Sequence, residues 1–320
     1  MAGKRILRVK FTDFWTNFIL AENLFFNLLN EKYRLHISDD PQLVIYSVFS
    51  NQFLDYKCPR LCYAGENRRI NFDECDFAFG YDYLADNPNY QRLPLWVLYG
   101  DPKVHTAPRP PAEQTLADKT GFCSVVVSNG DCQERNEFFA ALSHYKQVAS
   151  GGGYLNNVGG RVPDKHDFVR RYKFSMVFEN GSYPGYTTEK LLDGLVANTV
   201  PIYWGNPRAG EDFNPKAFLN YHDFASPKRL IERVIELDGD DDAYRAMLRE
   251  PIFADNRLPQ CAQYDYIARH LDHVVEQVDQ VTPVATTTRG RIAATRRRAA
   301  GAVAAVNAGL RAQARRVLRP

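Results

Sequence analysis

The sequence predicts an α/β fold with two domains, each built on a mainly parallel sheet, and three observations support this prediction. The chain has 320 residues, which is enough for two domains that each bury a core. Short apolar runs rich in β-branched and aromatic residues alternate with segments of helical length, as in parallel sheets. Four prolines fall within residues 102–113, and this stretch predicts a linker because proline continues neither a helix nor a central strand.

The first domain is expected to alternate strands and helices from its beginning. An amphipathic helical segment is expected around residues 18–29. Strands are expected at 6–11, 43–49, 61–64 and 77–79.

The second domain is expected to repeat this alternation from residue 123. A glycine-rich stretch, 151–160, does not follow a strand with the spacing of a dinucleotide fingerprint, so we predict no nicotinamide site. Strands are expected at 123–128, 174–178 and 200–204, the last as a buried core strand, and helices at 134–146, 229–237 and 243–248.

Composition excludes several classes of protein. Apolar residues make up 45% and aromatic residues 13%, which excludes a mostly disordered chain. The sequence has no apolar run of membrane-spanning length and no signal-peptide core at its start, so we expect a cytosolic protein. Six cysteines form no Cys-x-x-Cys pair, which favours reduced thiols over a zinc site.

Charge is distributed unevenly along the chain. Residues 289–320 contain nine arginines and no acidic residue, so the rest of the chain carries a net charge of −7 although the whole carries +2. Val303, Val306, Leu310 and Val317 fall at helical spacing, which predicts a basic amphipathic helix. We expect it to bind anionic membrane surfaces; a solvated disordered tail is the alternative, and nucleic-acid binding is disfavoured because the body is acidic.

An acidic run, 238–242, admits two interpretations. Its Asp-x-Asp spacing is found in metal-dependent glycosyltransferases. However, Gly239 is typical of a helix end, and the following aspartates suit the N-terminus of the next helix. We therefore predict helix capping here and no metal site.

Polar residues gather where one predicted strand ends and a helix begins, between Phe178 and Lys190. Thr187 or Thr188 is expected to open this helix. In open α/β sheets such a turn binds nucleotides, because helix N-terminal N–H groups face the phosphates. Lys190 supplies a full positive charge, while Glu179 and Glu189 can accept hydrogen bonds from ribose hydroxyls. A capped helix with nothing bound is the alternative.

The amino-acid sequence of this region resembles the signature of the α1,3/1,4-fucosyltransferases. The resemblance runs in order from about residue 6 to about residue 275. The matching blocks are Tyr63–Asn67, Phe77–Asp82, Val127–Asn129, Arg135–Phe139, Gly151–Gly159, Tyr172–Lys190, Val200–Gly205 and Asp212–Lys216.

The resemblance implies an inverting, metal-independent enzyme of GT-B type, with two Rossmann-like domains and a cleft between them. It implies an acceptor domain with the catalytic base in residues 1–118, a GDP-fucose domain in 119–282, and a basic tail in 283–320. The family's membrane-anchored animal members carry an N-terminal anchor and stem that we do not find here, so a bacterial-type cytosolic form, peripheral on the inner face of the plasma membrane, is expected.

Individual site residues are carried over by position. Glu66 matches the catalytic carboxylate, and Glu74 and Asp76 are weaker alternatives in the same domain. Arg135 and Lys190 match the phosphate-binding cations that make a metal cofactor unnecessary. Further matching donor-pocket residues are Asn180, Tyr186 and Glu189, and additional candidate donor contacts are Asn129, Glu179 and Asn206.

The predicted reaction transfers L-fucose from GDP-fucose to O3 or O4 of N-acetylglucosamine or glucose in an N-acetyllactosamine-like glycan, as in Lewis-antigen synthesis. Two alternatives stay open. One is a fucosyltransferase that acts on another polysaccharide. The other is a non-catalytic protein that binds GDP-sugars or glycans.

Overall fold

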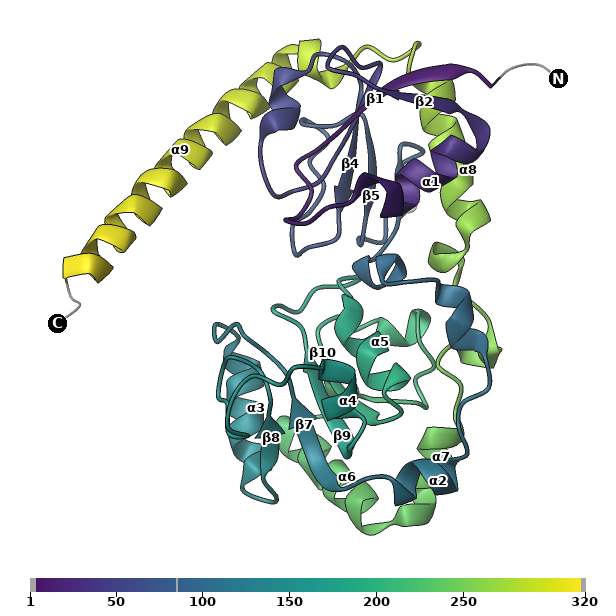
Figure 1. The fold of residues 1–320 in the computed structure, drawn as a ribbon, viewed down its shortest axis with the longest axis vertical. Helices are drawn as coiled ribbons and strands as arrows, with labels where there is room; N and C mark the ends of the chain where they lie inside the picture. The colour runs from purple at the N-terminus through teal and green to yellow at the C-terminus, as the bar shows by residue number, and fades with distance from the viewer. Residues whose placement is uncertain (1–3, 85, 318–320) are drawn as a thin grey trace.

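The computed structural model describes residues 4–84 and 86–317, with side chains as far as residue 303. Two α/β domains lie one above the other along the long axis of the molecule, and the final helix projects from one side of the first domain (Figure 1). Each domain has a single sheet of parallel strands, as the alternation of apolar runs predicts.

The N-terminal domain contains a six-stranded sheet in the order β2-β1-β3-β4-β5-β6. The central strands β3 and β4 are buried at every residue, which explains their continuous apolar sequence. The strands are β1 (Ile6–Thr12), β2 (Arg34–Ile37), β3 (Leu43–Tyr46), β4 (Arg60–Ala64), β5 (Phe77–Gly80) and β6 (Tyr90–Arg92).

The C-terminal domain contains a five-stranded parallel sheet in the order β11-β10-β9-β7-β8. Its strands are β7 (Gly121–Val125), β8 (Val148–Ser150), β9 (Tyr172–Phe178), β10 (Val200–Trp204) and β11 (Leu219–Asn220). All five residues of β10 are buried, so its prediction as a core strand is confirmed. The short strands β2, β6, β8 and β11 were not predicted, because two to four residues carry too little periodic pattern.

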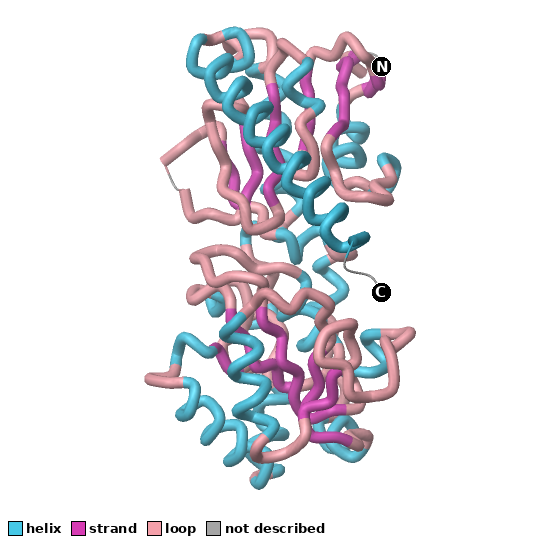
Figure 2. The backbone as a smooth tube through the Cα atoms, turned by 90° about the vertical axis from the view of Figure 1, so that its left-hand side faces the viewer, coloured by secondary structure: helices cyan, strands magenta, loops and turns pink. Residues whose placement is uncertain are grey.

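Helices cover both sheets, and loops that meet between the domains lie at the waist of the molecule (Figure 2). Helix α6 begins with Ser226 as its cap and ends at Gly239, the predicted stop. The helices are α1 (Leu24–Lys32), α2 (Ala112–Ala117), α3 (Gln133–Ser143), α4 (Lys165–Val169), α5 (Glu189–Val196), α6 (Pro227–Gly239), α7 (Asp241–Arg249), α8 (Tyr264–Gln277) and α9 (Thr288–Val317).

The donor domain was predicted to extend to residue 282, but α8 (Tyr264–Gln277) already packs on the N-terminal domain. Helix α8 runs alongside α1, and Lys32 pairs with Asp272 at 2.5 Å. Its buried residues Ile267 and Leu271 join the core that contains Leu7 and Val9 of β1. The apolar stripe of α8 does not reveal which sheet it will cover, so sequence order placed it with the wrong neighbour.

The tail begins with a docked segment instead of a free helix. Arg297 of α9 pairs with Glu74 at 2.5 Å, and both side chains are less than one-sixth exposed. Arg298 pairs with Asp55 at 2.8 Å, and Ala294 packs against the second apolar cluster of the N-terminal domain. The predicted positions Val306, Leu310 and Val317 lie outside the residues whose side chains are described.

A buried ion pair joins the two domains. Arg92, at the end of β6, donates from Nη1 and Nη2 to the two carboxylate oxygens of Asp212 at 2.7 and 2.6 Å. Burial alone would lower the pKa of Arg92, but the Asp212 charge outweighs it and raises the pKa. Because a two-bond guanidinium–carboxylate contact has a fixed geometry, this pair holds the two sheets in one orientation.

Candidate active site

The loop that follows β9 is organised by the carboxylate of Glu179, which is fully buried. Its Oε1 accepts from the backbone N–H of Thr188 and its Oε2 from the Thr188 hydroxyl, both at 2.7 Å. Thr188 opens α5 as predicted, although its own side chain makes no capping bond. A carboxylate from the neighbouring strand therefore occupies the N-terminal end of the helix, where the helix dipole favours negative charge.

Lys190 lies between two carboxylates. Its Nζ is 3.1 Å from Glu179 and 3.4 Å from Glu189, and it donates to the Thr188 hydroxyl at 2.9 Å. Burial acts to lower the pKa of Lys190, but these two charges outweigh it and raise the pKa. Burial acts to raise the pKa of Glu189, and the charges of Lys190 and Lys165 lower it instead. The ammonium is therefore charged and held at the start of α5.

Asn206 braces the same loop from the end of β10. Its Oδ1 accepts from the backbone N–H of Gly185 at 2.7 Å, and its Nδ2 donates to Thr187 at 3.1 Å. Gly185 has φ +92°, and a Cβ there would lie 2.1 Å from the carbonyl oxygen of Tyr81. Asn206 and Glu179 are predicted as candidate donor contacts, and in this structure both are buried and make hydrogen bonds that position the loop.

Arg135 lies in the first turn of α3 and is only 2% exposed. Its Nη1 donates to Oδ1 of Asn180 at 3.4 Å, and its Nη2 donates to the backbone carbonyl of Asn129. Among the described residues its Nε has no hydrogen-bond partner. The structure thus brings the predicted residues Arg135, Asn129 and Asn180 together at the edge of the second sheet, with donor capacity left on a buried cation.

Glu66 lies in the opposite domain, directly after β4. Gly65 precedes it in a tight position, where a Cβ would lie 2.6 Å from the Tyr63 hydroxyl and 2.9 Å from Leu95. Glu66 lines a cavity of about 400 Å³ together with Trp15, Ser47, Phe49, Tyr63, Gly65, Leu95, Leu98 and Tyr99. The carboxylate therefore opens onto a space large enough for a sugar ring.

The two alternative bases do not share this position. Glu74 pairs with Arg297 of the tail helix. Asp76 accepts from the backbone N–H groups of Arg60 at 2.9 Å and Val284 at 2.7 Å. Both carboxylates thus bind the chain's C-terminal segment, whereas Glu66 is the one of the three candidates that lines the cavity.

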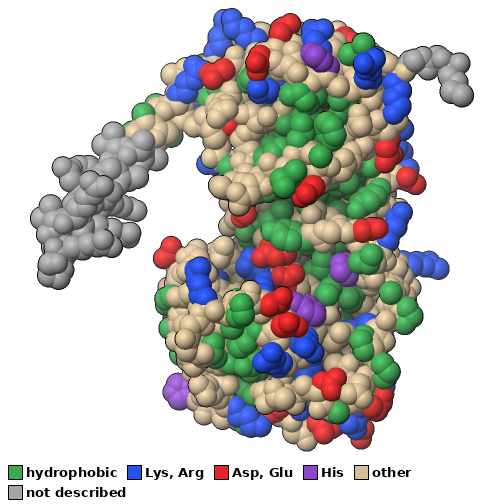
Figure 3. Space-filling model, in the orientation of Figure 1, with side chains coloured by type: hydrophobic (Ala, Val, Ile, Leu, Met, Phe, Trp, Pro, Cys, Tyr) green, Lys and Arg blue, Asp and Glu red, His purple; other side chains and the backbone are tan. Residues whose placement is uncertain are grey.

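Loops of the two domains meet around Tyr81 and Tyr186. The ring of Tyr186, 1% exposed, lies 5.3 Å from that of Tyr81, whose hydroxyl donates to Asn67 at 3.3 Å. A Cβ on Gly181 would lie 2.6 Å from Nδ2 of Asn67. Burial raises the pKa of Tyr186, and so do the charges of carboxylates from both domains, including Glu66. In the space-filling view, charged side chains gather at this level between the domains (Figure 3).

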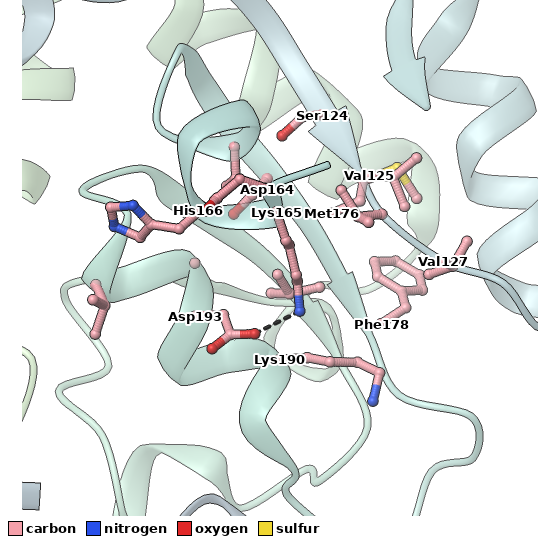
Figure 4. Close-up of a pocket in the computed structure, with 16 residues that line it drawn as sticks. Ser124, Val125, Val127, Asp164, Lys165, His166, Met176, Phe178, Lys190 and Asp193 are labelled. Atoms are coloured by element: carbon pink, nitrogen blue, oxygen red, sulfur yellow. Dashed lines mark hydrogen bonds and ion pairs between the residues drawn. The ribbon is translucent and has the colours of Figure 1, made fainter. Parts of the chain in front are cut away.

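Lys190 also lines a second cavity, of about 270 Å³, in the C-terminal domain between the ends of β7 and β9 and helices α4 and α5. Val125, Val127 and Phe178 form an apolar wall, and Lys165 pairs with Asp193 at 2.5 Å on the other side (Figure 4). Sequence reasoning missed Lys165 and Asp193, because no motif marks them and only the fold brings α4 against α5.

The acidic run at the junction of α6 and α7 has a structural role. Asp238 pairs with Lys146 at 2.5 Å and with Lys173 at 3.3 Å. Asp240 caps α7 by accepting from the backbone N–H groups of Asp242 and Ala243, which confirms the prediction of helix capping. Within residues 4–84 and 86–303, no group of three or more metal-ligating side chains occurs.

Comparison with known proteins places this geometry in a family. Residues 9–99 match the "Alpha-(1,3)-fucosyltransferase FucT N-terminal domain", and residues 116–249 match "Glycosyltransferase family 10 (fucosyltransferase) C-term". The chain belongs to the fucosyltransferase family. The motifs on which the resemblance was based fall within both matched segments, so the predicted family is confirmed.

Relatives with curated names support the same assignment. The chain is 31% identical to "Alpha-(1,3)-fucosyltransferase FucT" of Helicobacter pylori over 76% of its own length and 60% of that protein. It is 34% identical to "Alpha-(1,3)-fucosyltransferase 4" of Bos taurus over 54% of its own length and 44% of that protein. The chain thus spans 60% or less of the length of these relatives.

Solved structures identify the architecture as the GT-B fold. A crystal structure of an α1,3-fucosyltransferase with GDP-fucose superposes with a TM-score of 0.74 at 28% identity, covering 88% of this chain and 94% of that one. The Anabaena protein HepE in complex with UDP-glucose superposes with a TM-score of 0.53 at 7% identity, which indicates a shared fold alone. The predicted two-domain GT-B architecture is confirmed.

Proposed function

We propose that this fucosyltransferase-family chain transfers L-fucose from GDP-fucose to O3 or O4 of N-acetylglucosamine or glucose in a galactose-containing oligosaccharide, with inversion at the fucose C1. One observation supports this above all. Besides burial, Glu66 of one domain and Glu189 and Lys190 of the other all act on the pKa of Tyr99, which lines the cavity that contains Glu66, and Arg135 donates to Asn180 in the loop that precedes Lys190.

Glu66 is the general base in this proposal. As the acceptor oxygen forms its bond to C1 of fucose, the carboxylate takes the hydroxyl proton. The bond from C1 to the diphosphate oxygen breaks, and its electron pair leaves with GDP. Attack from the face opposite the leaving group inverts the configuration at C1. Because GDP leaves readily, no second carboxylate is needed as a general acid.

Arg135 and Lys190 neutralise the charge that develops on the departing diphosphate. The guanidinium offers a planar pair of donors to phosphate oxygens, and the ammonium offers a compact charge. Arg135 is buried, and Lys190 is partly buried and held by Glu179 before the donor arrives, so little reorganisation is required. We expect turnover without a bound metal ion, and EDTA should leave the rate unchanged.

The remaining donor residues suit the nucleoside. Glu189 can accept hydrogen bonds from ribose hydroxyls. Asn180 accepts from Arg135, and Tyr186 precedes Lys190 by four residues. The 270 Å³ cavity that Lys190 lines combines an apolar wall with the Lys165–Asp193 pair, which suits a flat base with polar edges.

Acceptor-dependent release of GDP tests the proposed activity. N-acetyllactosamine should stimulate GDP release from GDP-fucose, and mass spectrometry of the product should show one added deoxyhexose. A protein that binds GDP-fucose and N-acetyllactosamine without forming this product would be the non-catalytic binding protein. GDP release that occurs only with a different polysaccharide would favour a fucosyltransferase acting on that polysaccharide and would refute the Lewis-type assignment.

We also propose that the tail associates with anionic membranes through arginines that the N-terminal domain does not neutralise. Of the described arginines in α9, Arg289, Arg297 and Arg298 face acidic side chains, whereas Arg291 and Arg296 form no ion pair among the described residues. Each free arginine contributes about 1 kcal/mol near such a surface. In the described part of the chain, no helix is long and apolar enough to cross a membrane.

Co-sedimentation with anionic vesicles checks the tail. The full chain should pellet with them at low salt and be released at high salt, because the attraction extends over about one Debye length, ~10 Å. Truncation after Val303 removes Arg311, Arg315, Arg316 and Arg319 but keeps Arg291 and Arg296, so it should weaken pelleting and leave turnover unchanged. Adding Arg291→Ala and Arg296→Ala to the truncated chain should abolish pelleting. This cut is preferable to one near Pro283, because residues 284–298 attach to the N-terminal domain. Pelleting of this combined variant equal to that of the full chain would refute membrane binding by the tail.

A further inference from the structure

Trp15 separates two cavities on the surface of the N-terminal domain. The first, here the proximal cavity, is the 400 Å³ space that contains Glu66. The second, here the distal cavity, measures about 440 Å³ and is lined by residues 15–31 together with Val97, Leu98, Gly100 and Tyr264. Trp15 and Leu98 line both. The two cavities therefore adjoin at shared side chains, and together they are here called the groove.

The Trp15 indole meets an aromatic ring on each side. It lies 6.4 Å from the ring of Phe49, which lines the proximal cavity, and 5.7 Å from that of Phe18, which lines the distal one. Both contacts are edge-to-face, with interplanar angles of 78° and 82°. Phe49 is half exposed. Such exposed aromatic surfaces suit the C–H faces of sugar rings, which are apolar although the ring edges are polar.

The proximal cavity has unused hydrogen-bonding capacity. Tyr63 is 1% exposed, and its hydroxyl has no partner within the described residues. Leaving a buried hydroxyl unpaired costs about 1 to 3 kcal/mol, which a ligand hydroxyl would recover. Glu66 lies on the same wall and accepts hydrogen bonds. The proximal cavity thus offers one donor and one acceptor beside aromatic walls.

The distal cavity combines polar side chains with an apolar floor. Asn17, Glu22, Asn27 and Glu31 are exposed along it, and their side chains make no hydrogen bond or ion pair in the described part of the chain. Leu24, Leu28 and Val97 lie beneath them. Amides and carboxylates match neutral hydroxyl-rich ligands, while the two negative charges disfavour acidic ones.

The segment that carries Trp15 is held in a strained conformation. Asp13 and Asn17 have φ of 60° and 69°, the left-handed region that costs energy for residues other than glycine. Asp13 is anchored because its carboxylate accepts from the backbone N–H groups of Gln52 at 3.0 Å and Phe53 at 2.8 Å. These bonds fix the backbone beside Trp15, which is partly buried against the core of the domain.

We propose that the distal cavity is a second saccharide subsite, so that the acceptor is an oligosaccharide extending beyond the disaccharide unit that reacts. This inference rests on the proposed fucosyl transfer for its location beside Glu66. The Trp15 indole contacts the oligosaccharide where it passes from one cavity to the other. Asn27 and Glu31 of α1 bind hydroxyls of the sugar unit in the distal cavity.

Two acceptors of different length test the proposal. N-acetyllactosamine is compared with a tetrasaccharide of two N-acetyllactosamine units in series, which extends from the reacting unit whichever unit reacts. The wild type should have a kcat/KM about tenfold higher for the tetrasaccharide, equivalent to about 1.4 kcal/mol. The Asn27→Ala/Glu31→Ala double variant should lose this preference and keep the wild-type kcat/KM for the disaccharide.

A matched control and a binding measurement complete the experiment. Asn30→Ala changes the same residue type on the same helix outside the groove, and it should preserve the preference. Calorimetric binding of the tetrasaccharide in the presence of GDP should weaken in the double variant and stay unchanged in the control.

The outcomes separate the subsite from the reaction. Equal kcat/KM for the two acceptors, or equal tetrasaccharide binding by the double variant and the wild type, overturns the subsite while transfer to the disaccharide stands. Binding that depends on Asn27 and Glu31 without any transfer supports the subsite and refutes the proposed activity.

Discussion

The donor side and the acceptor side of the cleft are built in opposite ways. On the donor side, Glu179 and Asn206 are fully buried and their side chains are engaged in loop-positioning hydrogen bonds. On the acceptor side, Phe49 is half exposed and polar side chains such as Asn27 have no partner among the described residues. One side is fixed in advance, and the other presents a largely open surface.

The chemistry of the two ligands explains this difference. A diphosphate is highly charged, and cations placed in a buried loop stabilise it best when carboxylates such as Glu179 and Glu189 fix them beforehand. A neutral glycan gains little from buried charge. It gains from aromatic surfaces and exposed hydrogen-bonding groups, which need no rigid network behind them.

The largest effect is expected from removing the proposed general base, the Glu66 carboxylate on the acceptor side. Glu66→Gln should lower turnover at least ~10²-fold, the scale of general-base loss, with GDP affinity unchanged. Steady-state kinetics and calorimetry check the two parts. Glu236→Gln, an exposed surface change on α6, is the control. A Gln variant with near-wild-type turnover would remove Glu66 from the mechanism.

Loss of either donor-side cation should affect binding and rate together. Arg135→Ala and Lys190→Ala should each weaken GDP binding about 10- to 100-fold, because each cation contacts phosphate in the ground state and the transition state. Calorimetric titration with GDP measures this. Lys228→Ala, an exposed cation on α6, should change nothing. Unaltered GDP affinity in Arg135→Ala would separate this buried cation from the donor site.

The rigidity of the donor loop can be tested at a glycine. Gly185→Ala should destabilise the protein by about 1 to 3 kcal/mol and weaken GDP binding, because the Cβ of the alanine would clash with the carbonyl of Tyr81. Gly159→Ala is the matched control, since Gly159 also has positive φ, +85°, but has open space around it. Thermal unfolding with and without GDP distinguishes the two. Equal destabilisation would show that backbone strain alone matters.

A smaller effect is expected on the acceptor side. Trp15→Leu should raise the KM for the acceptor about 5- to 10-fold, the scale of a lost aromatic contact of about 1 kcal/mol, with GDP affinity unchanged. Trp15→Phe should retain part of the contact. If the Leu variant loses GDP affinity instead, Trp15 supports the fold of the whole cleft and the contrast between its two sides is weaker than described.

The smallest expected change is with pH. The pKa of Lys190 is raised and that of Glu189 is lowered, so both stay ionised from about pH 6 to about pH 9. The stabilisation from Glu189 is lost only as pH falls through its lowered pKa, well below this window. GDP affinity should therefore be nearly constant there in calorimetry. A decline that follows one proton in this range would show that an ionised group has been misassigned.

Much of this molecule follows from the sequence because the deciding interactions are local. The apolar runs predict the longer strands, Gly239 predicts the end of α6, and the pair Thr187 and Thr188 predicts the start of α5, since turn and cap preferences act within a few residues. The family motifs also predict site residues. Glu66 lies in the loop after β4, and Arg135 and Lys190 lie in the first turns of α3 and α5, while their roles stay a prediction.

Tertiary structure alone decided the features that depend on distant residues. The sequence does not reveal that the side chains of Glu179 and Asn206 make hydrogen bonds that position a loop, because their partners depend on the pairing of β9 with β10. Nor does it place α8 on the first domain, or Arg297 beside Glu74, since an amphipathic stripe and a charge do not specify their partners. The groove across Trp15 arises in the same way, from segments that meet only in the folded chain.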